Sequence, residues 1–251
     1  MPLCAAGLPI CLTSIVDLSD FRVLSFDCYG TMIDWETGIL ANIRPWLEVR
    51  GVEVEDVEIL EAFGWVEAAE EASTPDALYP NILTRVYDRL GAIWDLDSDP
   101  VAAARFGNSV GSWPPFSDSH DALTRLGRQY RLVILSNVDQ KSFAASRDQL
   151  DIDFDAVYTA ETIGSYKPDP ANFDYLLEAE RTAGYDQAEI LHVGQSLFHD
   201  HVPAAKAGIA TCWIQRPSPA GKHGAAQPLA TRPDVDFHFQ TLAELAAAAD
   251  N

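Results

Sequence analysis

The sequence predicts an α/β fold in which a doubly wound parallel sheet carries an inserted helical cap. Three observations support this prediction. Short apolar runs that end in small or polar residues recur along the chain, helical patterns separate the later runs, and a long, mainly helical segment follows the first run. Buried parallel strands read as continuous apolar runs, and strands that alternate with helices build doubly wound sheets.

The individual elements follow from the same patterns. Predicted strands lie at 22–26, 130–135, 154–158, 189–193 and 210–214, and predicted helices of the core at 141–150, 170–183 and 201–207. Apolar periodicity around 39–47, 57–65 and 82–90 predicts cap helices, residues 217–233 a surface loop, and 237–249 an edge strand with a terminal helix. We therefore divide the chain into an N-terminal extension (1–20), an α/β core (21–34 and 117–251) and a helical cap (35–116).

The charge balance restricts the partners. The chain has 17 Lys and Arg against 38 Asp and Glu, a formal net charge of −21, which repels nucleic acids and anionic membranes. We expect a small-molecule substrate, and an anionic one would need a local cation such as Lys167. The four cysteines (Cys4, Cys11, Cys28 and Cys212) lack CxxC spacing, which favours a reducing, cytoplasmic location. No apolar run approaches the length of a membrane span.

Polar residues follow four of the predicted strands where those strands end. Sheets of this type bind ligands beyond the carboxyl ends of their strands. The segments that converge there are Asp27-Cys28-Tyr29-Gly30-Thr31, Ser136-Asn137, Lys167-Pro168-Asp169-Pro170, and Gly194-Gln195-Ser196 with His199-Asp200. The sequence thus predicts one crevice that holds two carboxylates, hydroxyl groups and an ammonium group.

Four stretches carry a family resemblance. SFDCYGTMIDW (25–35), LVILSNVD (132–139), SYKPDP (165–170) and LHVGQSLFHD (191–200) resemble, in order, the four motifs of the haloacid dehalogenase superfamily, most closely its L-2-haloacid dehalogenase branch. The resemblance implies a hydrolase with Asp27 as the nucleophile, Thr31 ordering the nucleophile loop, Lys167 as the adjacent cation and Asp200 as the acidic residue of the fourth motif. It also implies substrate contacts from Cys28, Tyr29, Ser136, Asn137, Phe173, Ser196 and His199.

The implied reaction passes through an Asp27 ester, which water then splits. A nearby ammonium is expected to depress the pKa of a nucleophilic carboxylate and keep it ionised. Asp200 or His199 would orient or deprotonate the water. The predicted substrate is a small carboxylate such as a 2-haloacid, and the resemblance admits a homodimer.

Departures from the family pattern bear on the substrate. Tyr29 stands where phosphatases of the superfamily carry an acid that protonates the leaving group, and Gln195 stands where they carry a Mg²⁺-binding Asp. We therefore predict no cofactor, with Mg²⁺ required only if the protein is a phosphatase. A halide leaves without a proton, which favours the dehalogenase branch, yet the segment 61–70 lacks that branch's halide-binding arginine. Opening of an epoxide, with Tyr29 as proton donor, fits equally well.

Simpler interpretations stay open at this stage. Asp200 could cap a helix, Lys167 could be a solvated loop residue, and Ser136 and Asn137 could form a turn. His199 and His201 flank Asp200 and invite a metal hypothesis, although such alternation chelates poorly. Three aromatic residues of the cap segment could either pack in its core or contact substrate: Trp65, Tyr79 and Trp113. A non-enzymatic member serving as a scaffold is the remaining alternative.

Overall fold

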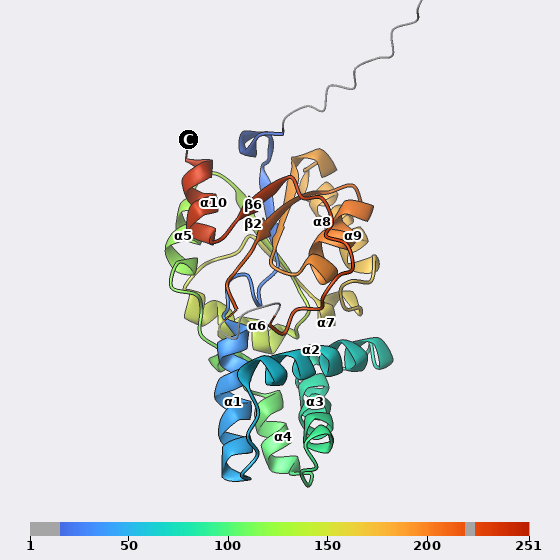
Figure 1. The fold of residues 1–251 in the computed structure, drawn as a ribbon. Helices are drawn as coiled ribbons and strands as arrows, with labels where there is room; N and C mark the ends of the chain where they lie inside the picture. The colour runs from blue at the N-terminus through green and yellow to red at the C-terminus, as the bar shows by residue number, and fades with distance from the viewer. Residues whose placement is uncertain (1–15, 219–223, 251) are drawn as a thin grey trace, which may run out of the picture.

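The computed structural model describes residues 16–218 and 224–250, and it has an α/β core beside a group of helices (Figure 1). Most of the predicted N-terminal extension, with Cys4 and Cys11, lies outside the described residues. Six parallel strands form one sheet in the order β3-β2-β1-β4-β5-β6. Their bounds are β1 Val23–Phe26, β2 Arg131–Ser136, β3 Ala156–Thr159, β4 Ile190–Gly194, β5 Ala210–Ile214 and β6 Phe237–Phe239. The predicted fold class is confirmed.

Helices cover both faces of the sheet, and each face has its own apolar cluster. Leu24 and Phe26 point to the side of α5 (Ser119–Leu126), α6 (Gln140–Leu150) and α10 (Leu242–Ala249). Val23 points to the side of α8 (Ala171–Ala183) and α9 (Val202–Lys206). Alternation along each strand therefore supplies both cores. The shorter helical elements are α7 Ala160–Ile163, η1 Leu18–Asp20, η2 Val110–Ser112, η3 Gln187–Glu189 and the π-helix η4 Leu197–His201.

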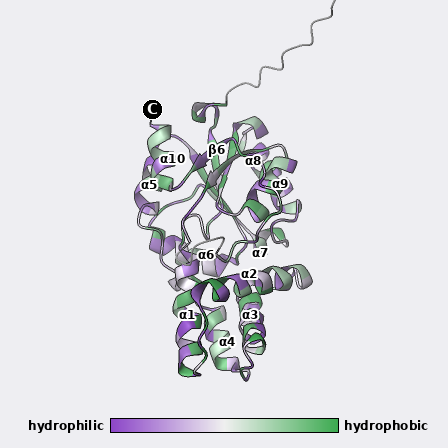
Figure 2. Cartoon of the chain, in the orientation of Figure 1, coloured by the Kyte–Doolittle hydropathy of each residue, from purple (hydrophilic) through white to green (hydrophobic). Residues whose placement is uncertain are grey.

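Four helices form the cap in the segment between β1 and β2. They are α1 Trp35–Val49, α2 Asp56–Ser73, α3 Tyr79–Ile93 and α4 Pro100–Gly107. Their residues alternate between hydrophobic and hydrophilic (Figure 2), as expected for amphipathic helices. Figure 1 shows α2 lying across the cap between the other cap helices and the core. Even α2, which has 18 residues, carries acidic side chains along its length, and none of the described helices is long and apolar enough to cross a membrane.

A short segment near the C-terminus holds α1 and α2 in place. We call residues 224–227 the strap. The backbone N–H of Ala225 donates to Glu36 Oε1 at 2.8 Å, and Gln227 Nε2 donates to the carbonyl oxygen of Gly64 at 2.6 Å. A Cβ atom at position 64 would lie 2.1 Å from the carbonyl oxygen of Ala225, so only glycine allows this close approach. Contacts of the strap thus fix the cap over the carboxyl ends of the strands.

Candidate active site

The strand order brings the predicted residues to one edge of the sheet. Phe26, the last residue of β1, pairs with Ile134 of β2 on one side and Val193 of β4 on the other. Asp27 therefore emerges between the ends of β2 and β4. Lys167 reaches the same place from the loop between α7 and α8, since its Nζ lies 3.0 Å from Asp27 Oδ1. The predicted convergence of a carboxylate and an ammonium group is present.

Both carboxylate oxygens of Asp27 have a donor. Lys167 Nζ donates to Oδ1, and Thr31 Oγ1 donates to Oδ2 at 2.8 Å. Thr31 is itself held, because the backbone N–H of Gln195 donates to its Oγ1 at 2.9 Å. The side chain of Asp27 is therefore fixed from two directions, as a nucleophile needs to be. This is the role that the sequence predicts for Thr31.

Lys167 is almost completely buried and uses all three of its donor positions. Its ammonium group contacts Asp27, Asp200 Oδ1 at 2.6 Å and the carbonyl oxygen of Leu135 at 2.8 Å. Asn137 fixes the backbone of this lysine: the Lys167 N–H donates to Asn137 Oδ1 at 2.6 Å, and Asn137 Nδ2 donates to the Lys167 carbonyl at 2.9 Å. The interpretation of Lys167 as a solvated loop residue is therefore wrong.

Asp200 is fully buried and serves as the second partner of the lysine. It also receives contacts from His192 Nε2 at 3.3 Å and the Ser196 backbone N–H at 3.2 Å. Burial raises the pKa of Asp200, but the attraction of Lys167 and the hydrogen bond from His192 outweigh burial and leave the pKa well below its usual value. Ser196, not Asp200, caps the helical turn that follows, because its hydroxyl accepts from the His199 N–H at 3.1 Å.

The pKa of Asp27 departs from the sequence-based expectation. Burial raises it, Lys167 lowers it and repulsion from Asp200 raises it again, and the net pKa is about 6. Lys167 lowers the pKa of Asp27 as expected, but burial and the repulsion from Asp200 outweigh this effect, because one ammonium group faces two buried carboxylates. Asp27 nevertheless remains ionised above about pH 6.

In front of Asp27 lies a cavity of about 50 Å³ between the core and the cap. We call it the Asp27 cavity. The core side of its wall contains most of the predicted residues, and the strap contributes one small residue. The lining residues are Asp27, Tyr29, Trp35, Glu67, Glu71, Tyr79, Ser136, Asn137, Lys167, Gln195, Ser196, His199, Asp200 and Ala226.

The cap side of the wall includes residues that the sequence analysis missed. Glu67 and Glu71 of α2 are both buried, and Asn137 Nδ2 lies 3.3 Å from Glu71 Oε2. Tyr79 of α3 donates to Glu67. Burial raises the pKa of Glu67 to about 7, and burial together with repulsion from Glu67 raises that of Glu71 well above its usual value. One sequence feature could have indicated that these two glutamates are buried: they continue the apolar face of α2, which runs through Ile59, Leu60, Phe63 and Val66.

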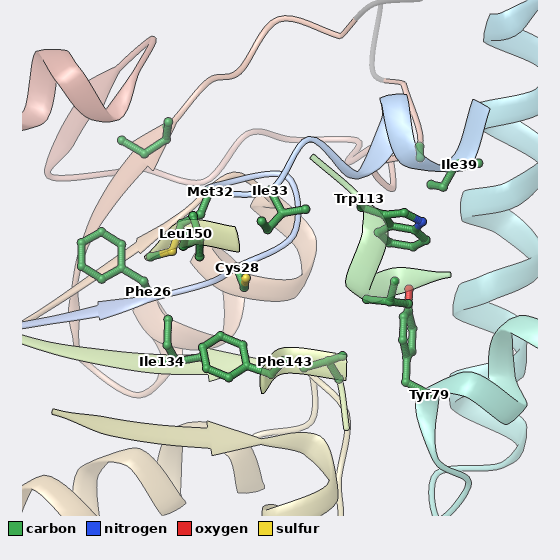
Figure 3. Packing of buried hydrophobic residues seen from close by; sticks show 14 of the residues in the cluster. Phe26, Cys28, Met32, Ile33, Ile39, Tyr79, Trp113, Ile134, Phe143 and Leu150 are labelled. Atoms are coloured by element: carbon green, nitrogen blue, oxygen red, sulfur yellow. The ribbon is translucent and has the colours of Figure 1, made fainter. Parts of the chain in front are cut away.

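Two side chains that were expected to contact substrate lie away from the cavity, and Cys28 fits the simpler interpretation of a packing residue. Cys28 is fully buried and packs in the apolar cluster, where Figure 3 shows it near Phe26, Ile134 and Phe143. Phe173 of α8 is also fully buried, and its ring contacts the imidazole of His192 edge-on at 5.0 Å on the other face of the sheet. Neither side chain lines the Asp27 cavity.

Of the three cap aromatic residues whose role the sequence left undecided, only Tyr79 lines the cavity. Trp113 is fully buried beside Tyr29 at a ring distance of 5.8 Å, and Trp65 is 61% exposed. Tyr29 lines the cavity, and its hydroxyl shares a hydrogen bond with Ser146 Oγ at 2.9 Å. Burial raises the pKa of Tyr29 well above its usual value, so this phenol stays protonated.

The two histidines beside Asp200 do not form a chelating pair. His201 Nε2 contacts the Gly194 carbonyl at 3.0 Å, whereas His199 Nδ1 contacts Ser196 Oγ at 3.2 Å and its Nε2 has no partner among the described residues. Burial lowers the pKa of His199 to about 4, so its ring is neutral at pH 7. Within residues 16–218 and 224–250, no group of three or more His, Cys, Asp or Glu side chains is arranged to hold a metal ion.

A magnesium ion fits the donors around Asp27 poorly. Mg²⁺ binds through carboxylates and water in near-octahedral geometry. Here both oxygens of Asp27 already accept hydrogen bonds, Asp200 is committed to Lys167, and Gln195 supplies a neutral amide. The cation next to Asp27 is the ammonium group of Lys167.

Comparisons with known proteins identify the family and the fold. A family model described as haloacid dehalogenase-like hydrolase matches residues 21–208. The L-2-haloacid dehalogenase from Xanthobacter autotrophicus with chloropropionic acid covalently bound superimposes with a TM-score of 0.75 at 18% identity, covering 92% of this chain and 99% of that chain. The magnesium-bound HAD-hydrolase YfnB from Bacillus subtilis gives a TM-score of 0.72 at 17% identity, with 92% and 99% covered.

One curated relative matches over a short stretch. The pyrimidine 5'-nucleotidase YjjG from Escherichia coli is 36% identical over 61 residues, which are 24% of this chain and only 26% of the length of that relative. The solved structures share too little sequence to establish more than the fold.

Proposed function

The chain belongs to the haloacid dehalogenase-like hydrolases, and we propose from this premise that it hydrolyses a small electrophile through an ester between Asp27 and a carbon atom. The observation that carries the proposal is the fixed carboxylate of Asp27, held by Lys167 and Thr31 at the wall of the Asp27 cavity. With a pKa of about 6, this carboxylate is both ionised at neutral pH and more basic than an exposed aspartate.

The proposed reaction has two steps. An oxygen of Asp27 attacks the carbon, and the leaving group departs with the electron pair of its bond. Water then attacks the ester at the carboxyl carbon of Asp27, which restores the carboxylate and releases an alcohol and one proton. We propose that His199 orients this water. His199 lines the cavity, and its Nε2 has no hydrogen-bond partner among the described residues. Asp200 is a weak base here, because Lys167 holds it ionised.

A halide is the leaving group that the site supports best. Phosphate-ester cleavage needs an acid for the departing alkoxide, and the position available for it holds Tyr29, whose hydroxyl is engaged by Ser146. The same engagement weakens the case for an epoxide opened with a proton from Tyr29. A 2-haloacid dehalogenase-like reaction therefore remains the leading proposal, while the charge of the substrate is a separate question.

Phosphatase action is the second candidate, because of the short match to a nucleotidase. It requires Mg²⁺ and predicts hydrolysis of p-nitrophenyl phosphate that EDTA abolishes. The dehalogenase proposal expects halide release that EDTA leaves unchanged. Hydrolysis of p-nitrophenyl phosphate that EDTA abolishes and Mg²⁺ restores, without halide release from the haloacids, would favour the second candidate.

A single-turnover reaction in ¹⁸O-labelled water tests the covalent step. Enzyme in excess over substrate should carry the label in Asp27, with unlabelled product, and the Asp27→Asn variant should release no halide. Asp174→Asn, on the exposed side of α8, is the matched control and should behave as the unaltered protein. Label found directly in the product of the first turnover would refute the ester intermediate.

A further inference from the structure

The cap wall of the Asp27 cavity presents two carboxyl groups. Glu67 and Glu71 lie four residues apart on α2, so their side chains project from the same face of the helix. They are 5% and 6% exposed, and both line the cavity that also contains Asp27. Figure 1 shows that α2 is the cap helix that faces the core. The two carboxyl groups therefore stand at the wall that a bound substrate must contact.

Neither carboxyl group has a cation within ion-pair distance in the described part of the chain. The neighbouring Glu70 differs sharply, since Arg89 lies 2.7 Å and Arg85 3.9 Å from its carboxylate. The cap thus places arginines beside Glu70, which does not line the cavity, while the hydrogen-bond partners of Glu67 and Glu71 among the described residues are the neutral side chains of Tyr79 and Asn137. A buried carboxyl group without a counter-ion holds its proton, and a cationic ligand would stabilise the ionised form of both glutamates.

A second, independent feature also indicates a missing ligand. Ser136 is 2% exposed, lines the same cavity, and its hydroxyl has no hydrogen-bond partner among the described residues. Buried hydroxyl groups almost always have a partner. A substrate that carries N–H groups would satisfy this hydroxyl and the two glutamates together. The aromatic side chains of Tyr29 and Trp35 complete a wall that favours a cation over an anion.

An anionic substrate finds no free cation among the described residues that line this cavity. The only cation in its wall is Lys167, whose three donors are already taken by protein oxygens. Arg216 and Arg232 line an adjoining cavity of about 340 Å³, which shares Trp35, Gln195 and Ala226 with the Asp27 cavity but does not include Asp27. There Arg216 donates to the Thr31 carbonyl and to Asp118, and Arg232 lies 4.2 Å from the ring centre of Trp213.

We propose that the non-reacting end of the substrate is a small cation, an ammonium or amidinium group, bound between Glu67, Glu71 and Ser136. The inference rests on the proposed function, because it assumes that Asp27 attacks the other end of the same molecule. A cavity of about 50 Å³ has room for a few atoms beyond the reacting carbon. The substrate class is therefore a short halogenated amine or amidine, in place of the small carboxylate that the sequence predicts.

A matched substrate series tests this inference with the full chain. Chloroacetate, chloroacetamide and chloroacetamidine share one C–Cl bond and differ in charge from −1 through 0 to +1. We expect kcat/KM for halide release to be at least tenfold higher for the amidine than for the acetate. In Glu71→Gln and Glu67→Gln the amidine should lose at least tenfold while the amide changes little. Glu61→Gln, an exposed position of α2, is the control and should change none of the three.

A binding measurement separates this inference from the proposed reaction. Acetamidinium and acetate have no leaving group, so calorimetric titration of the unaltered protein reports binding whether or not Asp27 reacts. Acetamidinium should bind, and the Gln variants, if their circular dichroism spectra match the parent, should bind it at least tenfold more weakly. Tighter binding of acetate, or a preference for chloroacetate in turnover, would overturn the cation inference and leave the Asp27 ester standing. Halide release that survives Asp27→Asn would instead overturn the proposed reaction.

Discussion

Replacing Lys167 with Met would leave two buried carboxylates without a cation. At an effective dielectric constant of about 20, an ammonium group 3.0 Å from Asp27 and 2.6 Å from Asp200 attracts each by about 6 kcal/mol. The desolvation of the lysine offsets a large part of this attraction. Removal of one partner from a buried ion pair costs about 3–5 kcal/mol, and we expect a loss of unfolding free energy in that range at pH 8.

The stability loss of Lys167→Met should depend strongly on pH. Without Lys167, the folded-state pKa values of Asp27 and Asp200 rise above the unfolded value of about 4. A carboxyl group with a raised folded-state pKa binds its proton more tightly in the native state, so stability is present at low pH and is lost as pH rises through the folded pKa. The destabilisation of Lys167→Met should therefore be small at pH 5 and large at pH 8.

Urea unfolding followed by circular dichroism at pH 5, 7 and 8 measures this effect. Adding Asp200→Asn to Lys167→Met removes one of the two unpaired charges and should restore part of the stability at pH 8. Lys206→Met, at an exposed position of α9, should stay within about 0.5 kcal/mol of the parent. A loss that is equal at pH 5 and pH 8, or no larger than that of the control, would refute the counter-ion role of Lys167.

Two further predictions concern Asp27 and Gly194. A plot of kcat/KM against pH should fall on the acid side with a midpoint near pH 6, because Asp27 attacks only when ionised and its pKa is raised to about 6. Full activity at pH 4.5 would contradict this role. Gly194→Ala should lower the unfolding free energy by about 1–3 kcal/mol and remove most of kcat, because the added Cβ would lie 2.6 Å from Asp200 Oδ2. Thermal unfolding and turnover measure both effects, and a variant indistinguishable from the parent would show that Asp200 can move freely.

The core of the site was predictable because strand ends in a parallel sheet meet at one edge. Once the apolar runs are recognised as β1 to β4, the segments that follow them must converge, and Asp27, Lys167 and Asp200 do so in the structure. Strand prediction succeeded since strands buried on both faces leave a continuous apolar run. The short helix α5 was missed, because its eight residues span only two turns.

The errors arise where side-chain direction depends on the local path of the backbone. Cys28 and Tyr29 are neighbours in the nucleophile loop, yet one enters the apolar cluster and the other lines the cavity. Phe173 points into the face of the sheet below the crevice, a direction set by how α8 docks. Glu67 and Glu71 line the same cavity as Asp27 because the cap folds back over the core, and the pattern of α2 marks their face as buried without showing what they face.

The strap has a consequence for the order in which the molecule is assembled. Synthesis of the chain delivers all four cap helices early, but the hydrogen bond from Ala225 to Glu36 spans 189 positions of sequence. The tight contact between Gly64 and Ala225 has the same requirement. The contacts that hold the cap over Asp27 can therefore form only after residue 225 has been synthesised, long after the cap helices themselves.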